Sequence, residues 1–484
     1  MSAQAKMDVG GILRPQGQLD IATALQPYPE TLGDRAAAHL LRRAGFGGTP
    51  EAVRRYAGMR ADAAVASLLA LPPARSIAPP ELNETDRPAP MFAADTQDPK
   101  MRRRERRREE VEVIVAMQLW WLNRMLTTPA PLQEKMTLYF HGHFTSRATP
   151  RFPWITYNQN ALFRRYALGN IRELTREVSK DAAMLLYLGG SANVAAHPNE
   201  NYARELMELF TLGVDNYSEN DVRESARAWT GWRVDHRSDT VTFDPGLHDG
   251  GVKTFLGRTG NFNGDDIVNI IFEQPQCARF FASSLLNWFV YNDPEPELVD
   301  AVAGLLRRHD FELEPVVGTL LRSNVFYGPR AYRALVKSPV EFVVGTYEVL
   351  GLPAIDATAL VALQQMGQRL FYPPSVAGWP GGQNWLTSGT MIARQNFLTR
   401  LLDSQTLKSS SWLQALPVTP QAAAQRLVQA ILQNDTAPAS FAEFDGYLSG
   451  SGSAALASLS AENHDQRVSG AVYLAMATPA YQLG

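Results

Sequence analysis

The chain has 484 residues, of which 45% are apolar, 10% aromatic and 20% charged. This is an ordinary globular composition with enough length to bury a core, which excludes a disordered chain, a fibrous chain and a small disulfide scaffold. Lysine and arginine number 46 against 49 aspartates and glutamates, so the formal net charge of −3 gives no overall bias towards nucleic acid or anionic lipid.

The single cysteine and the lack of long apolar segments exclude further classes of protein. Cys277 is the only cysteine, which excludes an intramolecular disulfide and any site with several cysteine ligands. A transition metal would therefore need histidine and carboxylate ligands. Residues 1–26 lack the continuous apolar stretch of a secretory signal, and no run of about 18 apolar residues could span a bilayer. We expect a cytoplasmic protein without a membrane span, while low cysteine use also suits a periplasmic protein whose leader is missing.

The first elements in chain order are an arm, two short helices and a loop. Residues 1–34 are rich in Gly, Pro and Gln without periodicity, which predicts an extended N-terminal arm. A helical pattern around Leu40 ends at Gly45, and Thr49 caps the next helix, which has proline at its first position. Residues 72–99 hold many prolines and predict a surface loop.

A strongly charged segment, RRRERRREE, occupies residues 102–110 and leads into an apolar helical pattern. Its six arginines are interleaved with three glutamates, which favours a self-paired, solvated helix start over a nucleic-acid surface. We therefore expect no nucleic-acid partner. The apolar stripe that follows, from Val111 to Leu126, is wide enough for a largely buried helix.

The remaining chain predicts helices almost throughout. Helical patterns cover residues 132–140, 162–188 with a break at Gly169, 218–229, 266–290, 296–308, 314–326, 338–351, 386–404, 420–433 and 466–477. The only β signal is the alternation of polar and apolar residues over 240–243. This segment could pair with 253–256 across the HDGG turn. We predict an all-α protein with at most one small hairpin around residues 240–256, and one large helical domain over 35–484, in two lobes.

The first candidate for chemistry is the pair His141 and His143, separated by Gly142. Two residues at this spacing lie about 200° apart on a continuous helix and could not share one metal ion there. On extended backbone both would project to the same side, and Gly142 is a natural place for a helix to end. Either both imidazoles converge on a metal, or His143 packs locally while His141 satisfies a helix end.

The second candidate is the segment NENYARELMELF at residues 199–210. Glu205 and Glu208 share one side of the predicted helix, because they are three residues apart. Beside the two histidines, this carboxylate pair would suit a hard or borderline metal ion with nitrogen and oxygen ligands. The alternative is that Arg204 pairs with Glu208 at spacing four on a solvated surface.

Two loops complete the candidate residues. The glycine-rich turn at 243–253 would present His248 and Asp249 as a ligand pair, an acid–base group or an anion contact, although hairpin tips without function look similar. The aromatic loop at 373–385 has no ionisable side chain, and its Trp379 could line a pocket or serve as a structural wedge. Glycine-rich nucleotide-binding motifs and a serine-nucleophile elbow are both missing.

Seven segments in order carry a family resemblance. They are HLLRRAGFGGTP (39–50), PLQEKMTLYFHGHFTS (131–146), NENYARELMELFTLGV (199–214), ARAWTGW (226–232), KTFLGRTGNFNGDDIV (253–268), KSPVEFVVG (337–345) and PPSVAGWPGGQNWL (373–386). Together they resemble the bacterial domain family of unknown function DUF1800, from about residue 35 to the C-terminus. The resemblance implies a mostly helical single-domain protein and no known reaction. Many relatives carry export signals and are encoded beside a second uncharacterised family, DUF1501, which resembles sulfatase and phosphatase folds.

Two hypotheses follow. The first is a helical enzyme whose polar site binds a divalent metal, or works by acid and base without one, with the Trp379 loop as one wall. The second is a non-catalytic binding or assembly protein, whose polar motifs form a buried network and which works with a DUF1501-like partner. The residues assigned to the site are the metal ligands His141, His143, Glu205 and Glu208, and the catalytic candidates Arg204, Glu205, Glu208, His248 and Asp249.

Overall fold

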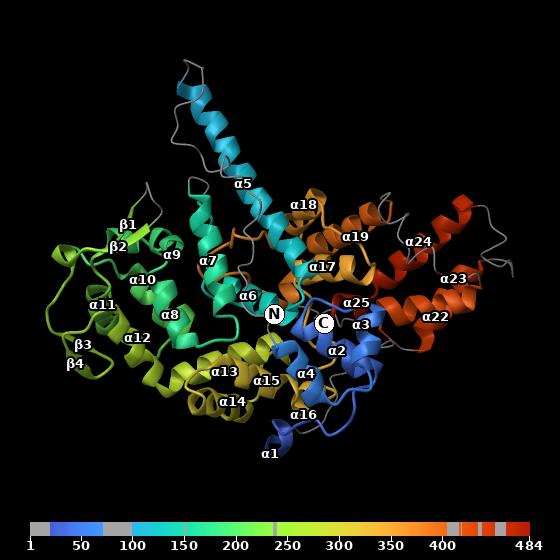
Figure 1. Cartoon of the computed structure of the whole chain (residues 1–484), viewed down its shortest axis with the longest axis horizontal. Helices are drawn as coiled ribbons and strands as arrows, with labels where there is room; N and C mark the ends of the chain where they lie inside the picture. The colour runs from blue at the N-terminus through green and yellow to red at the C-terminus, as the bar shows by residue number, and fades with distance from the viewer. Residues whose placement is uncertain are drawn as a thin grey trace, which may run out of the picture.

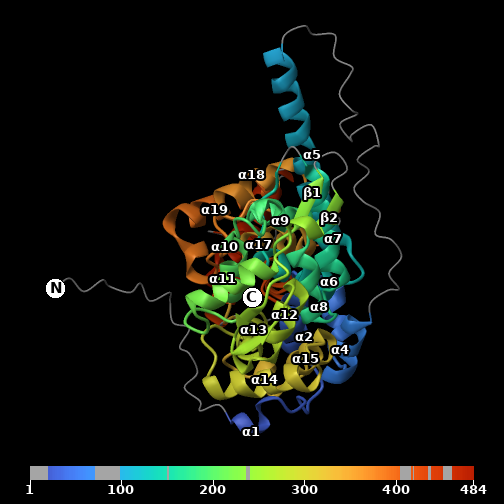
Figure 2. The same cartoon turned by 90° about the vertical axis from the view of Figure 1, so that its left-hand side faces the viewer.

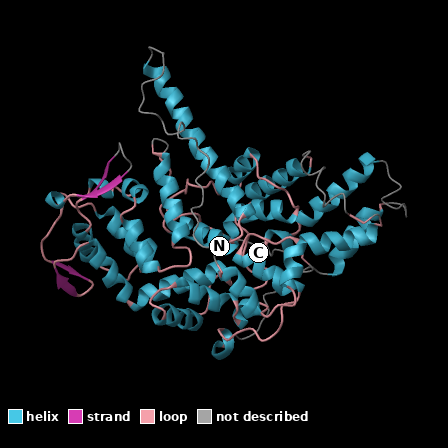
Figure 3. Cartoon of the chain, viewed as in Figure 1, coloured by secondary structure: helices cyan, strands magenta, loops and turns pink. Residues whose placement is uncertain are grey.

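The computed structural model describes residues 20–70, 99–149, 152–235, 240–403, 416–417, 419–433, 438–450 and 461–484. These residues are mainly helical, with two small two-stranded sheets, so the predicted all-α class is confirmed (Figure 3). Residues 1–19 of the predicted arm and residues 72–98 of the predicted loop lie outside the described residues. None of the described helices is long and apolar enough to cross a bilayer.

The N-terminal part contains four short helices. They are α1 (Ile21–Ala24), α2 (Asp34–Ala44), α3 (Pro50–Tyr56) and α4 (Ala61–Leu69). The Thr49 side chain accepts a hydrogen bond from the Ala52 N–H at 3.1 Å, so the predicted cap of α3 is confirmed. The described end of the predicted arm contains α1, and backbone bridges from Pro27 to Ser323 and from Thr31 to Arg60 attach it to the body.

The next two helices, α5 (Pro99–Thr127) and α6 (Pro131–His143), lead into the centre of the molecule. The arginine-rich segment at 102–110 belongs to α5, whose N-terminal half projects beyond the other described residues (Figures 1 and 2). Arg108 pairs with Glu112 of the same helix at 2.9 Å, as expected for interleaved charges one turn apart.

Helices α7 to α11, teal to green in Figure 1, follow α6 and lie to its left in that view. They are α7 (Pro153–Arg165), α8 (Ile171–Ser179), α9 (Ala182–Tyr187), α10 (Glu200–Glu205) and α11 (Glu219–Ala228). The pattern predicted over 162–188 breaks near Gly169 as expected, and it breaks again because Asp181 caps α9 through the N–H groups of Ala183 and Met184. Ser218 forms the predicted capping box of α11.

The small sheets differ from the predicted hairpin. Strand β1 (Trp232–Asp235) pairs with β2 (Thr240–Phe243), and β3 (Lys253–Phe255) pairs with β4 (Arg258–Gly260), both antiparallel. The predicted pairing of 240–243 with 253–256 is therefore wrong. Each strand joins its nearest neighbour in sequence across a short connection, which closes a smaller loop than the HDGG turn would have closed.

Most of the described residues of the C-terminal half are helical. Its helices are α12 (Gly264–Glu273), α13 (Pro275–Phe289), α14 (Pro296–Arg308), α15 (Leu313–Leu321), α16 (Asn324–Tyr327), α17 (Pro339–Val349), α18 (Ala357–Gln365), α19 (Ser388–Leu402), α22 (Pro420–Ile431), α23 (Pro438–Ser449), α24 (Ala461–Ala477) and α25 (Pro479–Gln482). The pattern predicted over 266–290 divides into two helices, because Pro275 cannot continue the ladder of α12 and instead begins α13.

Two large hydrophobic clusters meet at α6. The larger one joins α2 to α4 with α8 and α10 to α16, and the other joins α5 with α17 to α19 and α22 to α25. Within α6, Phe140 packs in the first cluster and Leu138 in the second. Trp288 of α13 packs against both. Because both clusters include side chains of α6, different faces of this helix have different surroundings.

Candidate functional site

Helix α6 is continuous through Gly142 and ends at His143. The predicted break at Gly142, on which convergence of the two imidazoles depended, does not occur. Residues at spacing two therefore keep their helical separation of about 200°, and the two histidine rings enter different surroundings.

His141 is buried in an aromatic cage. Its Nε2 accepts a hydrogen bond from the Phe371 backbone N–H at 3.1 Å, and the rings of Trp121 and Trp379 lie 5.1 and 5.3 Å away, centroid to centroid. Burial lowers the pKa of His141 to about 3, so the ring is neutral. Because the Nε2 lone pair already accepts a hydrogen bond, it is not available to a metal ion.

His143 points to the opposite side of α6. Its Nε2 donates a hydrogen bond to the Phe210 carbonyl oxygen at 2.9 Å, and its ring stacks on Tyr139 at 5.8 Å. Burial lowers the pKa of His143 to about 4, with the Phe210 hydrogen bond acting weakly in the other direction. The two histidines thus use Nε2 in opposite roles, one as acceptor and one as donor.

The four predicted metal ligands consequently do not form one site. His141 and His143 are engaged with backbone groups of different segments, and neither ring hydrogen-bonds to Glu205 or Glu208. Across the described ranges, no group of three or more His, Cys, Asp or Glu side chains is placed to hold a metal ion. The prediction that both histidines bind one metal ion required a break in the helix at Gly142. Helix α6 has no such break, so this prediction is corrected.

The two carboxylates lie where α10 changes its hydrogen-bonding pattern. Asn199 caps α10 by accepting a hydrogen bond from the Asn201 N–H at 3.0 Å. Glu205 ends the α-helical part, and the chain continues as the π-helical segment η3 (Leu206–Thr211), which contains Glu208. Such π-helical turns are uncommon and occur frequently at functional sites.

Glu205 and Glu208 have unequal surroundings, although both are half-buried. The Tyr217 hydroxyl donates a hydrogen bond to Glu208 Oε2 at 2.8 Å. No described residue donates a hydrogen bond to the Glu205 carboxylate, and burial together with the negative charge of Glu208 raises the pKa of Glu205, while Arg204 opposes this rise. The pair therefore consists of one anchored carboxylate and one that is biased towards its protonated form.

Arg204 does not make the pair with Glu208 that the alternative reading predicted. Its two terminal nitrogens bind Glu219 of α11, both at 2.8 Å, and it lies 3.5 Å from Glu200 one turn earlier. Helix α11 packs against α10, which brings Glu219 within reach of the guanidinium. Arg204 thus connects α10 to α11, and the hydrogen bond to Glu208 comes from Tyr217 instead.

His248 and Asp249 belong to a separate polar network. Arg227 binds the Asp249 carboxylate at 2.7 Å and Glu224 at 2.9 Å, and Lys253 donates to the Asp249 carbonyl oxygen at 2.6 Å. His248 Nδ1 donates to the Thr230 carbonyl oxygen at 2.9 Å. The hydrogen bonds of these described residues hold the turn before β3 on α11 and do not include Glu205 or Glu208.

Tyr187, which lies near Glu205, and two residues associated with it, Arg147 and Tyr372, were not found from the sequence. Tyr187, at the end of α9, is half-buried, and burial raises the pKa of its phenol, while the charge of Arg147 lowers it and the charge of Glu205 raises it. The Arg147 guanidinium lies 5.8 Å from the ring centroid of Tyr372. Arg147 thus lies near both Tyr187 and Tyr372, and Tyr187 also lies near Glu205. The only signal was that Tyr372 directly precedes the aromatic loop.

The aromatic loop is wedged against the end of α6. Gly378 has a φ of +78°, and a Cβ there would lie 2.5 Å from the Gly142 carbonyl oxygen, so only glycine fits. The Thr145 hydroxyl donates to the Val376 carbonyl oxygen on the same loop. These contacts place the half-buried Trp379 against His141. These contacts give the aromatic loop a structural role. The loop also contacts Thr145, two residues before Arg147.

A large groove lies elsewhere, between α13 and α14. It has a volume of about 550 Å³ and is lined by Gln276, Phe280, Ser283, Ser284, Asn287 and Val299, among others. Ser284 accepts a hydrogen bond from the Tyr139 hydroxyl at 2.8 Å, and the ring of Phe280 lies 5.9 Å from that of His143. The groove is therefore adjacent to the packing around His143, and neither carboxylate lines it.

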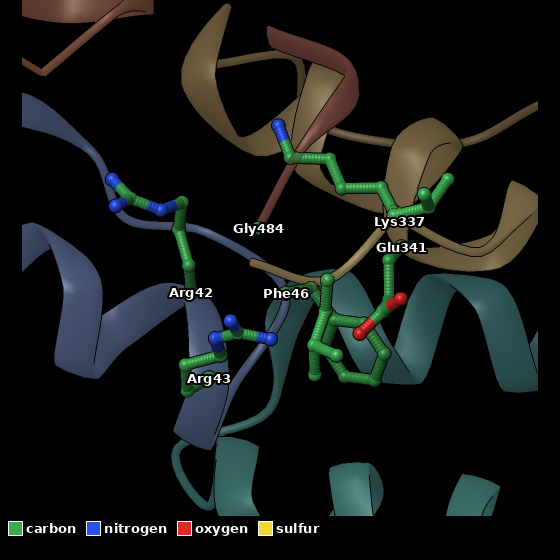
Figure 4. A pocket seen from close by; sticks show the side chains of 8 residues that line it. Arg42, Arg43, Phe46, Lys337, Glu341 and Gly484 are labelled. Carbon is green, nitrogen blue, oxygen red and sulfur yellow. The ribbon is translucent and has the colours of Figure 1, made fainter. Parts of the chain in front are cut away.

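A second, much smaller cavity of about 10 Å³ has room for one water molecule (Figure 4). Arg42, Arg43 and Lys337 lie around it with the side chain of Glu341, which pairs with Lys135 of α6, and with Gly484. Arg43 also donates to backbone carbonyl groups. This cluster connects distant segments, and its cavity is too small for an organic substrate.

Comparison with known proteins gives one match. Curated proteins and solved structures each gave no match to the chain. The profile of the family described as "Protein of unknown function (DUF1800)" matches residues 39–483. Because this match spans nearly the whole sequence, the chain belongs to the DUF1800 family.

Proposed function

We propose that this protein is an enzyme in which Glu205 acts as a general acid or base and Glu208 is the second carboxylate of the site. The observation that supports this is the unequal environment of the two carboxyl groups, one hydrogen-bonded by Tyr217 and the other without a donor among the described residues. Paired carboxyl groups whose surroundings separate their proton affinities are typical of acid–base catalysis.

The direction of the Glu205 shift suits proton transfer near neutral pH. An ordinary glutamate is almost fully ionised at pH 7 and is a weak acid–base catalyst for that reason. Burial and the nearby Glu208 charge raise the pKa of Glu205 towards the working range, and its half-buried position keeps it within reach of a bound molecule. His141 and His143 have no part in this proposal, because their Nε2 atoms are already hydrogen-bonded to backbone groups.

A titration of the carboxyl groups tests this directly. The protein is labelled with ¹³C at glutamate side chains, and the Glu205 signal is assigned by comparing wild type with Glu205→Gln. We expect its midpoint to lie above the ordinary value for glutamate and to fall in Glu208→Gln, which removes the neighbouring negative charge. A midpoint at or below the ordinary value would contradict the proposal.

Activity gives the second test. Chromogenic esters, glycosides and phosphates are offered to wild type, Glu205→Gln and the control Glu51→Gln, whose carboxylate is in an exposed ion pair with Arg54. We expect Glu205→Gln to lose about 100-fold or more in rate, the usual size of a general acid–base contribution, and Glu51→Gln to lose nothing. A reaction that wild type and Glu205→Gln catalyse equally would exclude Glu205 as its acid or base.

A second candidate function is binding of a partner protein of the DUF1501 type. It is favoured by the position of the large groove, which neither Glu205 nor Glu208 lines. Its test is co-purification of the two proteins with wild type, Glu205→Gln and Ser283→Tyr, which fills part of the groove. Binding that survives Glu205→Gln and fails in Ser283→Tyr would support assembly through the groove, and the reverse pattern would contradict it.

A further inference from the structure

Two arginines lie near one tyrosine ring, that of Tyr372. The guanidinium carbon of Arg369 lies 3.9 Å from the ring centroid of Tyr372, and that of Arg147 lies 5.8 Å from the same centroid. Both distances are within the range of cation–π attraction, which holds a guanidinium near an aromatic face without using its N–H donors. The arginines come from segments more than 200 residues apart in sequence, and the fold alone brings them together.

Neither of these arginines is paired with a carboxylate of the described residues. In the part of the chain that the structure describes, neither guanidinium makes an ion pair or a hydrogen bond. Burial raises the pKa of the Tyr372 phenol, while the positive charges of Arg369 and Arg147 lower it. Arg204 is different, because Glu219 and Glu200 bind it.

Tyr187 connects this positive spot to Glu205. The charges of Arg147 and Glu205 both act on the half-buried Tyr187 phenol, in opposite directions, so both groups lie near this ring. Arg147 itself is exposed and Arg369 is half-buried, so their N–H donors remain open to a dissolved molecule. A guanidinium offers two parallel N–H groups that match the two oxygens of an oxyanion.

We propose that Arg147 and Arg369 form a subsite for an oxyanion, and that the substrate of this protein is a molecule that carries a phosphate, sulfate or carboxylate group. The oxyanion lies between the two guanidinium groups at the Tyr372 ring, and the bond that reacts lies beside Glu205. This inference rests on the proposed function for the position of the reacting bond. The subsite itself depends only on the two arginines.

Inorganic phosphate is the probe for the subsite. Its binding to the full chain is measured by isothermal titration calorimetry for wild type, Arg147→Gln, Arg369→Gln and the double variant. We expect saturable binding to wild type, a loss of affinity of about tenfold or more in each single variant, as for loss of one charge-assisted hydrogen bond, and no measurable binding in the double variant. The control is Arg54→Gln, whose guanidinium is paired with Glu51 at 2.8 Å.

The outcomes separate the two proposals. No saturable phosphate binding to wild type, or equal binding by the folded double variant, overturns the subsite. Glu205→Gln should keep or increase phosphate affinity, because it removes a negative charge near Arg147. If the arginine variants lose phosphate while the Glu205 titration is ordinary, the subsite stands and the acid–base function fails. Circular dichroism melting confirms that each variant is folded, which we expect since neither arginine has a polar partner to lose.

Discussion

The Nε2 proton of His143 is donated to the carbonyl oxygen of Phe210 at a distance of 2.9 Å. This hydrogen bond connects the last residue of α6 to the π-helical segment that carries Glu208. A π-helical turn leaves its terminal carbonyl groups without the usual helical partners, so a donor from another element stabilises it. His143 thus helps to hold the shape of the carboxylate segment without contacting a substrate.

His143→Ala should therefore destabilise the fold. The change removes a hydrogen bond and the ring that stacks on Tyr139, and we expect a loss of roughly 2–4 kcal/mol in the free energy of unfolding. Urea denaturation measures this. His197→Ala, at an exposed histidine, is the control and should lie within about 0.5 kcal/mol of wild type. Equal stability of the two variants would show that the Phe210 contact does not support the segment.

The two buried histidines should make the protein sensitive to acid. Burial lowers their pKa values to about 3 for His141 and about 4 for His143, so the unfolded chain, with an ordinary value near 6.5, binds protons first. Stability is then complete above pH 6.5 and is lost as the pH falls towards 4 and 3. For His143 the expected loss in the free energy of unfolding reaches roughly 3 kcal/mol. His141→Gln should show a shallower fall in unfolding free energy between pH 6.5 and 4.5 than wild type, and an unchanged slope would disprove the assignment.

Glu348 should give a pH dependence of the opposite sign. Burial raises the pKa of Glu348, near the end of α17, to about 7, so the folded chain holds a proton that the unfolded chain releases above about pH 4.5. Its contribution is present at low pH and is lost as the pH rises from 4.5 through 7. We expect Glu348→Gln to stabilise the protein at pH 8 by up to roughly 3 kcal/mol and to have little effect at pH 5. Urea denaturation at both pH values measures the difference, and equal effects would contradict the shift.

The buried carboxylate Glu134 of α6 should be among the most sensitive positions. It is fully buried and accepts hydrogen bonds from Trp121, Arg124 and Arg164. Removing it leaves the Arg164 guanidinium buried without its partner, so Glu134→Ala should cost about 3–5 kcal/mol or prevent folding. Glu51→Ala breaks an exposed pair and should cost less than about 1 kcal/mol. Soluble yield and chemical denaturation compare the two, and a mild effect at Glu134 would contradict its structural importance.

Gly378 provides a test of the aromatic loop with a close control. Gly378→Ala introduces a side chain where φ is +78° and where its Cβ would meet the Gly142 carbonyl oxygen, so the loop must move away from α6. Gly351 also has a positive φ, +62°, but nothing lies within 4 Å of its Cβ position, so Gly351→Ala measures the backbone strain alone. We expect about 1 kcal/mol at Gly351 and more at Gly378, together with altered Trp379 fluorescence in Gly378→Ala only. Equal costs would mean that the close approach is unimportant.

Local signals in the sequence predicted the helices well, because helix formation depends on neighbouring residues. The caps at Thr49 and Ser218 satisfy helix N–H groups within three residues, and the pattern break near Gly169 is also a local property. Pro275 was overlooked within the pattern over 266–290, although its restriction on helix continuation is visible in the sequence.

Contacts between segments that are distant in the sequence could not be predicted from local signals. Glu205 and Glu208 were found as a pair, since three residues on one helix face are close by geometry, but their unequal environments depend on Tyr217 and on burial. The fold alone placed Arg369 and Arg147 on one tyrosine ring.

The sequence by itself determined that this protein is helical, which residues begin its helices, and which polar groups are available for chemistry. Only the tertiary structure decided which of those groups meet. The reason is that helical periodicity fixes the direction of a side chain relative to its own helix, whereas the packing partner on that side comes from elsewhere in the chain. His141 and His143 illustrate this, because α6 lies between two hydrophobic clusters and the angle of about 200° between the two side chains gives their rings different partners.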